Sequence, residues 1–194
     1  MLTDLPNVLT LSRIAAIPVL VLLVAIRAPL SDLLVAILFA LAAITDWLDG
    51  RLARSRRQLS NLGRMLDPIA DKLLVGATLM VLVGFNRLPF LGIYPAIVIM
   101  LREILVSGLR EYLAGIRIGL PVTKLAKWKT ATQMASLLLL LLGNSGAGEL
   151  GIGGFPATAL GGALLWLAAL LTLVTGWDYL TAGLRHVIQP DPAP

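Results

Sequence analysis

The segment from Asp46 to Asp71 reads DWLDGRLARSRRQLSNLGRMLDPIAD. It contains four of the eleven acidic residues of a 194-residue chain that is 58% hydrophobic. Thirteen uncharged residues, 33–45, precede it, and another thirteen, 73–85, follow shortly after it. As a helix, each run extends about 20 Å through a bilayer core about 30 Å thick. The stretch therefore predicts two antiparallel membrane helices whose carboxylates lie at similar depth near one membrane surface.

The composition of the whole chain supports an integral membrane protein. Mean hydropathy is +0.88 and only 14% of the residues are charged, which lies outside the range of soluble globular proteins. Cysteine is absent, so disulfides and thiolate metal sites are excluded, and His186 is the single histidine. Residues 1–4 lack the basic region of a secretory signal, so we expect the N-terminus to be retained. The net charge of +5 is attributed to topology and anionic lipid, with no nucleic-acid partner expected.

Hydropathy and length predict an all-α, polytopic membrane protein with six transmembrane helices, forming a single domain over residues 1–194. The expected spans are 12–27, 31–53, 66–86, 89–116, 124–143 and 157–185. Residues 2–10 are amphipathic and predict a short N-terminal interfacial helix before the first span. The Gly-rich segment 143–156 is expected to be a flexible loop, and residues 189–194 a frayed tail.

Basic residues predict the orientation of these spans. They gather in the second and fourth connections, the former containing Arg51, Arg54, Arg56, Arg57 and Arg64, and the latter Arg117, Lys124, Lys127 and Lys129. The first, third and fifth connections contain Arg27, Arg87 and no basic residue, respectively. By the positive-inside rule, both termini and the second and fourth connections are expected on the cytoplasmic side.

The acidic residues share helix faces with small residues. Asp46, Asp49, Gly50 and Ala53 follow the i, i+3, i+4, i+7 spacing, and Gly63, Asp67 and Asp71 follow i, i+4, i+8, unless Pro68 starts or kinks that helix. Carboxylate oxygens suit hard divalent cations, and the small residues leave room for a bulky ligand. Since four clustered carboxylates repel one another when partly buried, we expect them to bind cations. The alternative is a solvated hairpin in which these acids pair with nearby arginines.

The same residues carry a resemblance to the CDP-alcohol phosphotransferase family, whose pattern is DxxDGxxAR, eight residues, then GxxxDxxxD. All eight fixed positions match: Asp46, Asp49, Gly50, Ala53, Arg54, Gly63, Asp67 and Asp71. The resemblance implies six membrane helices, a homodimer, and displacement of CMP from a CDP-linked substrate by an alcohol with Mg²⁺ or Mn²⁺, as two ions. It implies that Asp46, Asp49, Asp67 and Asp71 bind metal and that Asp71 is also the general base. Implied contacts to CDP-diacylglycerol come from Gly50, Ala53, Arg54, Ser60, Gly63 and Arg13.

Three further segments resemble the phosphatidylglycerophosphate synthase branch of this family. They are PNVLTLSRIAAIP at 6–18, LREILVSGLREYLA at 101–114 and KWKTATQ at 127–133. This resemblance implies that sn-glycerol 3-phosphate is the acceptor in a multi-pass cell-membrane enzyme of phospholipid synthesis. An anionic acceptor requires cations, and the candidates are Arg102, Arg110, Lys124, Lys127 and Lys129. These cations have other possible roles: marking the cytoplasmic side, pairing with Glu103 and Glu111, or touching lipid headgroups.

Other functions remain open on the sequence. The same signature serves acceptors such as inositol phosphate, serine or phosphatidylglycerol. A divalent-cation transporter is the alternative from a different class, because intramembrane acids can line an ion path. Against a transporter, the four acids cluster near one surface and no matching polar residues continue through 33–45 or 73–85. The absence of cysteine and the distance of His186 along the chain favour direct attack by the acceptor over a covalent protein intermediate.

Overall fold

The computed structural model describes residues 5–56, 61–116, 119 and 123–188, with all their side chains except those of 5–7, 46–56, 61–65, 67, 68 and 184–188. The described residues form six α-helices and no strand, which confirms the predicted all-α class. The helices are α1 (Leu5–Ile26), α2 (Pro29–Arg56), α3 (Asn61–Gly84), α4 (Ile93–Gly115), α5 (Lys124–Glu149) and α6 (Ala157–Ile188).

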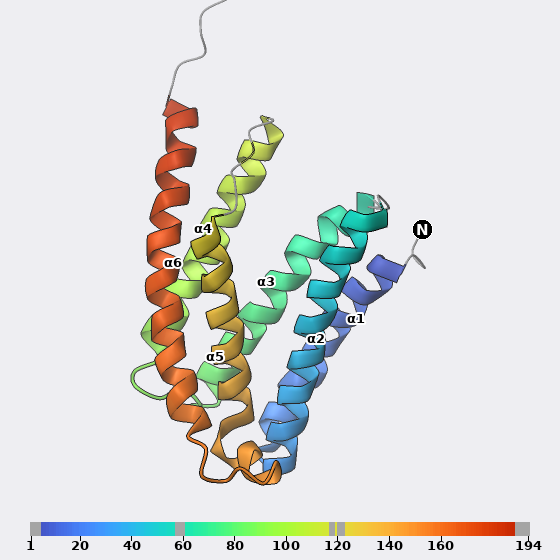
Figure 1. The fold of residues 1–194 in the computed structure, drawn as a ribbon, viewed down its shortest axis with the longest axis vertical. Coiled ribbons are helices and arrows are strands. Elements are labelled where there is room, and N and C mark those ends of the chain that lie inside the picture. Colours follow the sequence, from blue (N-terminus) through green and yellow to red (C-terminus); the bar gives the residue numbers. More distant parts are fainter. Residues whose placement is uncertain (1–4, 57–60, 117–118, 120–122, 189–194) are drawn as a thin grey trace, which may run out of the picture.

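The helices alternate in direction along one long axis of the molecule (Figure 1). Helix α1 begins at the end of the molecule where α2 and α4 finish and where α3 and α5 begin. The opposite end contains the α1–α2, α3–α4 and α5–α6 connections. Short connections between consecutive helices produce this antiparallel arrangement. The arrangement brings the end of α2 and the start of α3, which carry the acidic signature, to the same end as the start of α5.

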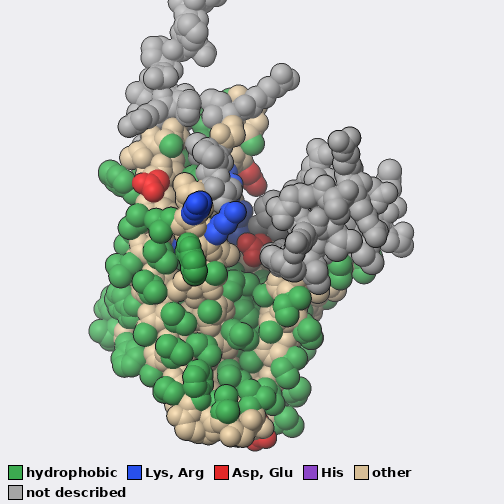
Figure 2. All heavy atoms as spheres, in the orientation of Figure 1, with side chains coloured by type: hydrophobic (Ala, Val, Ile, Leu, Met, Phe, Trp, Pro, Cys, Tyr) green, Lys and Arg blue, Asp and Glu red, His purple; other side chains and the backbone are tan. Residues whose placement is uncertain are grey.

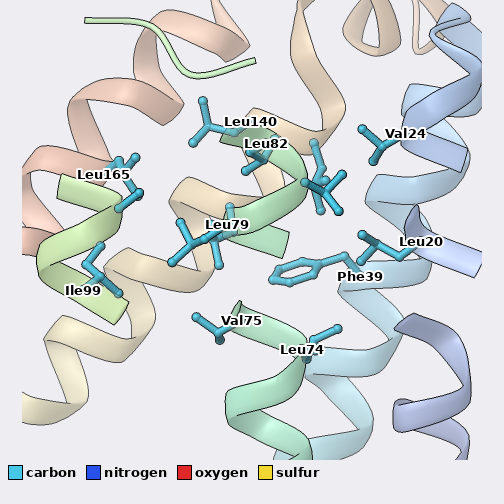
Figure 3. Packing of buried hydrophobic residues seen from close by; sticks show 14 of the residues in the cluster. Leu20, Val24, Phe39, Leu74, Val75, Leu79, Leu82, Ile99, Leu140 and Leu165 are labelled. Carbon is cyan, nitrogen blue, oxygen red and sulfur yellow. The ribbon is translucent and has the colours of Figure 1, made fainter. Parts of the chain in front are cut away.

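Large aliphatic side chains from all six helices fill the centre of the bundle (Figure 3). Phe39 of α2 lies among Leu20 of α1 and Leu74 and Leu79 of α3, and each of these side chains is at most 1% exposed. Ile99, Leu140 and Leu165 extend the cluster to α4, α5 and α6. Because lipid tails are as apolar as leucine, such contacts hold membrane helices together mainly through close packing.

The outward faces of the helices are also apolar. On α2, Phe39 is buried, whereas Ile37 and Leu41 are 47% and 55% exposed. A helix that is hydrophobic on every side suits a lipid environment. Within the described residues, two helices are both long and apolar enough to cross a bilayer, Val8–Ile26 and Ala157–Gly183, and Pro29–Thr45 is a shorter apolar helix. The predicted total of six spans is not established by this measure.

The prediction of a separate interfacial helix over residues 2–10 is wrong for the described part of that segment. Helix α1 runs without interruption from Leu5 to Ile26. Pro6 falls in its first turn, where a missing backbone N–H is tolerated. Residues 7–17 contain neither proline nor glycine, so nothing stops the helix from continuing into the apolar segment.

The prediction of a flexible loop from residue 143 to 156 is also wrong in its first half. Gly143 breaks α5 with φ 59° and ψ 178°, but helix resumes beyond it and continues to Glu149. Ala147 in this final segment is fully buried, and Gly146 approaches the backbone of α2 so closely that a Cβ would lie 3.1 Å from the Leu33 nitrogen. The segment is therefore a packed corner, and the connection proper is confined to residues 150–156.

A polar network joins the three connections at this end. Arg87 Nη1 donates to Asp32 Oδ1 at 2.5 Å, and Ser145 Oγ donates to Asp32 Oδ2 at 2.7 Å. Asp32 is only 6% exposed, so its charge is compensated inside the protein. The network links the start of α2 and the α3–α4 connection with the corner at Gly143. Helix α4 itself starts at Ile93 and not at residue 89, because Phe90 and Leu91 adopt positive φ angles of 52° and 54°.

Candidate active site

The backbone of the acidic signature is helical throughout its described part. Helix α2 carries Asp46, Asp49, Gly50, Ala53 and Arg54, and α3 carries Gly63, Asp67 and Asp71. Ser60 and the side chains of all these residues except Asp71 lie outside the described part of the structure. Since α3 begins at Asn61, Pro68 lies inside the helix and does not start it. The two predicted stripes are thus each carried by one helix.

Asp71 is the member of the signature whose surroundings are described. Its half-buried side chain lines a cavity of about 80 Å³ where α3, α4 and α5 meet. The other lining residues are Lys72, Val75, Met100, Glu103, Ile104, Lys129, Thr130, Gln133 and Met134. A carboxylate in this position has space beside it for a small reacting group, while the surrounding helices limit its exposure to water.

Lys129 and Glu103 form an ion pair at the wall of this cavity. The Lys129 ammonium contacts Glu103 Oε1, and Lys129 is only 5% exposed. Glu103 Oε1 also lies 3.6 Å from Arg102 Nη1. Burial of a lysine in this way requires a partner charge, which Glu103 supplies. The ion pair with Glu103 on α4 therefore fixes the side chain of Lys129. From the sequence alone, a contact to the acceptor and an ion pair with Glu103 were both possible for this lysine.

A second cavity of about 260 Å³ lies next to the first. Its lining residues are Lys72, Arg102, Glu103, Val106, Ser107, Arg110, Glu111 and Ala114. Lys72 and Glu103 line both cavities, so their side chains form the boundary between the space at Asp71 and the space at the two arginines. Lys72 also donates a hydrogen bond from Nζ to the Ser107 hydroxyl on α4. The carboxylate of Asp71 and a cation-rich cavity are thus neighbours.

One aromatic ring contacts both arginines. The guanidinium carbons of Arg102 and Arg110 are each 5.6 Å from the centroid of the Tyr179 ring, within the range of cation–π attraction. Arg102 Nη2 also donates to Thr175 Oγ1 at 3.1 Å. Gly176 allows this approach of α4 to α6, because a Cβ there would lie 3.0 Å from Arg102 Cγ. Helix α6 therefore positions both guanidinium groups.

Charged side chains gather near this end of the bundle, on a surface that is otherwise largely hydrophobic (Figure 2).

The remaining candidate residues occupy different surroundings. Lys124 and Lys127 are exposed on the first turns of α5, and neither lines the cavities at Asp71 or Arg102. Arg13 on α1 is 2% exposed, so its charged side chain is enclosed by the bundle. The structure brings Asp71, Arg102, Arg110 and Lys129 together around two adjoining cavities.

The sequence alone did not identify Lys72, Thr175 or Tyr179. Lys72 follows Asp71 directly, and that adjacency was the only sequence signal for it. Thr175 and Tyr179 lie on α6, in the part of the chain that reads as generic membrane helix, so only the packing of α6 against α4 shows their contacts to the arginines. Such contacts between distant segments leave no periodic pattern in a sequence.

Comparison with known proteins identifies a family for this chain. A family model described as CDP-alcohol phosphatidyltransferase matches residues 3–174. A protein of Rickettsia bellii is 45% identical over 92% of this chain and 94% of its own length. Proteins of Cereibacter sphaeroides and Bacillus subtilis are 41% and 38% identical, covering 95% and 92% of this chain and 97% and 94% of their own lengths. All three relatives are named CDP-diacylglycerol--glycerol-3-phosphate 3-phosphatidyltransferase.

These matches agree with the eight signature positions between Asp46 and Asp71. They extend over nearly all of the described helices, from the start of α1 into α6. The chain belongs to the CDP-alcohol phosphatidyltransferase family.

Proposed function

We propose that this chain transfers the phosphatidyl group from CDP-diacylglycerol to sn-glycerol 3-phosphate, which gives phosphatidylglycerophosphate and CMP. Membership of a phosphatidyltransferase family supports the transfer, and the shared name of the relatives supports this acceptor. The observation that carries the proposal is the cavity of Arg102 and Arg110 directly beside the cavity of Asp71. An acceptor with an anionic phosphate at one end and a hydroxyl at the other suits that arrangement.

The proposed reaction is a direct displacement at phosphorus. The acceptor hydroxyl oxygen bonds to the phosphatidyl phosphorus, and the bond from that phosphorus to the oxygen shared with CMP breaks. CMP departs with the bonding electrons, and Asp71 takes the proton of the attacking hydroxyl. The half-buried position of Asp71 beside a cavity supports this role, because a general base must reach the hydroxyl.

The metal ions are part of the same proposal. Asp46, Asp49, Asp67 and Asp71 would hold two Mg²⁺ or Mn²⁺ ions, and their all-oxygen donor set fits such hard cations. Asp71, the described member, presents its carboxylate at a cavity, which leaves space for a ligand. When bound, the ions would neutralise the diphosphate of the substrate and assist departure of CMP. Contacts to the CDP portion are assigned to Gly50, Ala53, Arg54, Ser60, Gly63 and Arg13.

The acceptor phosphate is assigned to the arginine cavity. Arg102 and Arg110 share the ring of Tyr179, which holds both guanidinium groups near one space. Lys124 and Lys127, exposed on α5, remain predicted contacts for the incoming acceptor. Lys129 remains a candidate through the cavity at Asp71, although it is paired with Glu103.

The membrane arrangement is proposed as six spans with both termini and the active site on the cytoplasmic side. The apolar outward faces of the helices and the alternating directions of α1 to α6 support this topology. Arginines and lysines at the end that carries the signature agree with the positive-inside rule. A homodimer is proposed from the family resemblance.

An acceptor panel tests the proposal. Purified protein in detergent with CDP-diacylglycerol and Mg²⁺ or Mn²⁺ should release CMP with glycerol 3-phosphate and much more slowly with serine, inositol phosphate or phosphatidylglycerol. Absence of CMP release with glycerol 3-phosphate would refute this acceptor, and release with another alcohol would identify the alternative. Uptake of divalent cations into liposomes, without CMP release in the panel, would instead support the transporter.

A further inference from the structure

Lys72 occupies the boundary between the two cavities. It follows Asp71 on α3, and its side chain lines both the space beside Asp71 and the space beside Arg102 and Arg110. Its ammonium reaches α4, where it donates to the Ser107 hydroxyl. Lys72 and Glu103 are the two residues that line both cavities, and Glu103 contacts Lys129. Lys72 is thus the cation common to both cavities.

The charge of Lys72 has no acidic partner within the described part of the chain. Its hydrogen-bond partner, Ser107, is a neutral hydroxyl, and an ammonium has three donors to place. Lys129 differs, because Glu103 compensates its charge at the wall of the smaller cavity. A half-buried cation with a neutral partner attracts an anion that enters beside it.

The larger cavity has the size and charge for a small phosphate ester. Lys72, Arg102 and Arg110 supply three cations to its lining, against the carboxylates of Glu103 and Glu111. Because Lys129 contacts Glu103 from the other side, the space beside the arginines keeps a positive character. Its volume of about 260 Å³ equals that of roughly nine water molecules at about 30 Å³ each.

We propose that Lys72 is a specificity-determining residue that binds the phosphate of the acceptor together with Arg102 and Arg110, and so directs the acceptor hydroxyl to Asp71. This inference rests on the proposed function. Since Lys72 adjoins Asp71, a phosphate held at Lys72 leaves the rest of a short acceptor within the space that Asp71 lines. The acceptor is selected because it is anionic, and an uncharged alcohol lacks the group that Lys72 holds.

The test separates binding of the acceptor from chemistry. In Lys72→Met, which keeps most of the length of the side chain and removes its charge, the KM for glycerol 3-phosphate should rise about 10- to 100-fold, the range expected when a charge-assisted hydrogen bond is lost. The KM for CDP-diacylglycerol should change less than about threefold. Lys72→Arg should recover most of the acceptor affinity. Arg27→Gln, which removes an exposed cation at the opposite end of the bundle, is the matched control and should behave as wild type.

Each outcome has a defined meaning. A kcat that falls in Lys72→Met while the KM for glycerol 3-phosphate stays unchanged would overturn the inference, because Lys72 would then act on Asp71 and not on the acceptor. An equal rise of both KM values would also overturn it, by indicating a general structural role. If Lys72→Met unfolds at a lower temperature, Lys72→Gln and Lys72→Arg provide the same comparison. Failure of wild-type protein to use glycerol 3-phosphate would refute the proposed function itself, which is a separate result.

Discussion

Asp71 connects the sequence signature with the described cavities. It is the last acidic residue of the signature and the one whose side chain is seen to line a space between α3, α4 and α5. Replacing it by asparagine keeps the size of the side chain but removes its capacity to take a proton. We expect Asp71→Asn to lower kcat by a factor of about 10²–10⁴, the usual contribution of general base catalysis.

Binding of CDP-diacylglycerol is the control for Asp71→Asn. Affinity measured by calorimetry at saturating Mg²⁺ should stay within a few-fold of wild type, because the other three acids of the signature remain. Near-normal turnover would remove Asp71 from the role of base. Loss of binding together with turnover would indicate that Asp71 serves the metal ions alone.

Asp46 is expected to act through the metal ions and not through the proton. Its place one helical turn before Asp49 puts two candidate metal-binding residues on one face of α2. Asp46→Asn should raise the Mn²⁺ concentration for half-maximal activity by about tenfold or more, in line with the loss of ligand charge at such sites. Chelation by EDTA should abolish wild-type activity, and an Asp46→Asn enzyme with an unchanged metal dependence would exclude this ligand.

At the scale of single elements, hydropathy predicted the helices well and their ends poorly. Each of the six expected spans falls on one helix, because long apolar runs admit little else. The errors fall at Leu5, at Phe90 and Leu91, and after Gly143, where continuity or a positive φ angle decides the boundary. These features depend on contacts between helices, such as the close approach of Gly146 to α2. A hydropathy profile gives no information about such contacts.

Gly143 provides the prediction for α5. Its φ of 59° with ψ of 178° lies in a region that is essentially restricted to glycine, and a side chain there costs about 1–3 kcal/mol. We expect Gly143→Ala to lower the thermal unfolding temperature in detergent. Gly148→Ala is the matched control: it lies in the same helical segment at a non-positive φ, has no atom within 4 Å of an added Cβ, and should be neutral or slightly stabilising. Equal effects of the two variants would contradict the assigned conformation of Gly143.

For the acids of the candidate site, the sequence predicted the helices α2 and α3 that carry them, and Asp71 is the acid whose side chain the structure describes. Between Asp46 and Asp71, the acids recur at helical spacing together with small residues. This pattern is visible in the sequence without knowledge of the fold. Basic residues, in contrast, can mark the cytoplasmic side of a membrane protein or bind an anionic substrate. The sequence does not distinguish these two roles. The structure separates Lys129, paired with Glu103, from Lys72, which faces both cavities, through contacts between α3, α4 and α5.

For the whole molecule, the topology is the first property to test. The chain contains no cysteine, so single cysteines can be introduced and labelled without background. Gly148→Cys and Gly119→Cys place thiols at opposite ends of the bundle, both at positions where an added Cβ meets no atom within 4 Å. In intact cells, a membrane-impermeant maleimide should label Gly148→Cys and leave Gly119→Cys unlabelled until the cells are opened. The reverse pattern would invert the proposed orientation.

We propose that the chain moves a phosphatidyl group directly to glycerol 3-phosphate. Its most direct test is the ratio of products from purified protein supplied with CDP-diacylglycerol and isotopically labelled glycerol 3-phosphate. We expect CMP and labelled phosphatidylglycerophosphate to appear together in a ratio of about one to one, and we expect Asp71→Asn to reduce both in parallel. Release of CMP without labelled lipid, or labelled lipid that forms at the wild-type rate in Asp71→Asn, would contradict it.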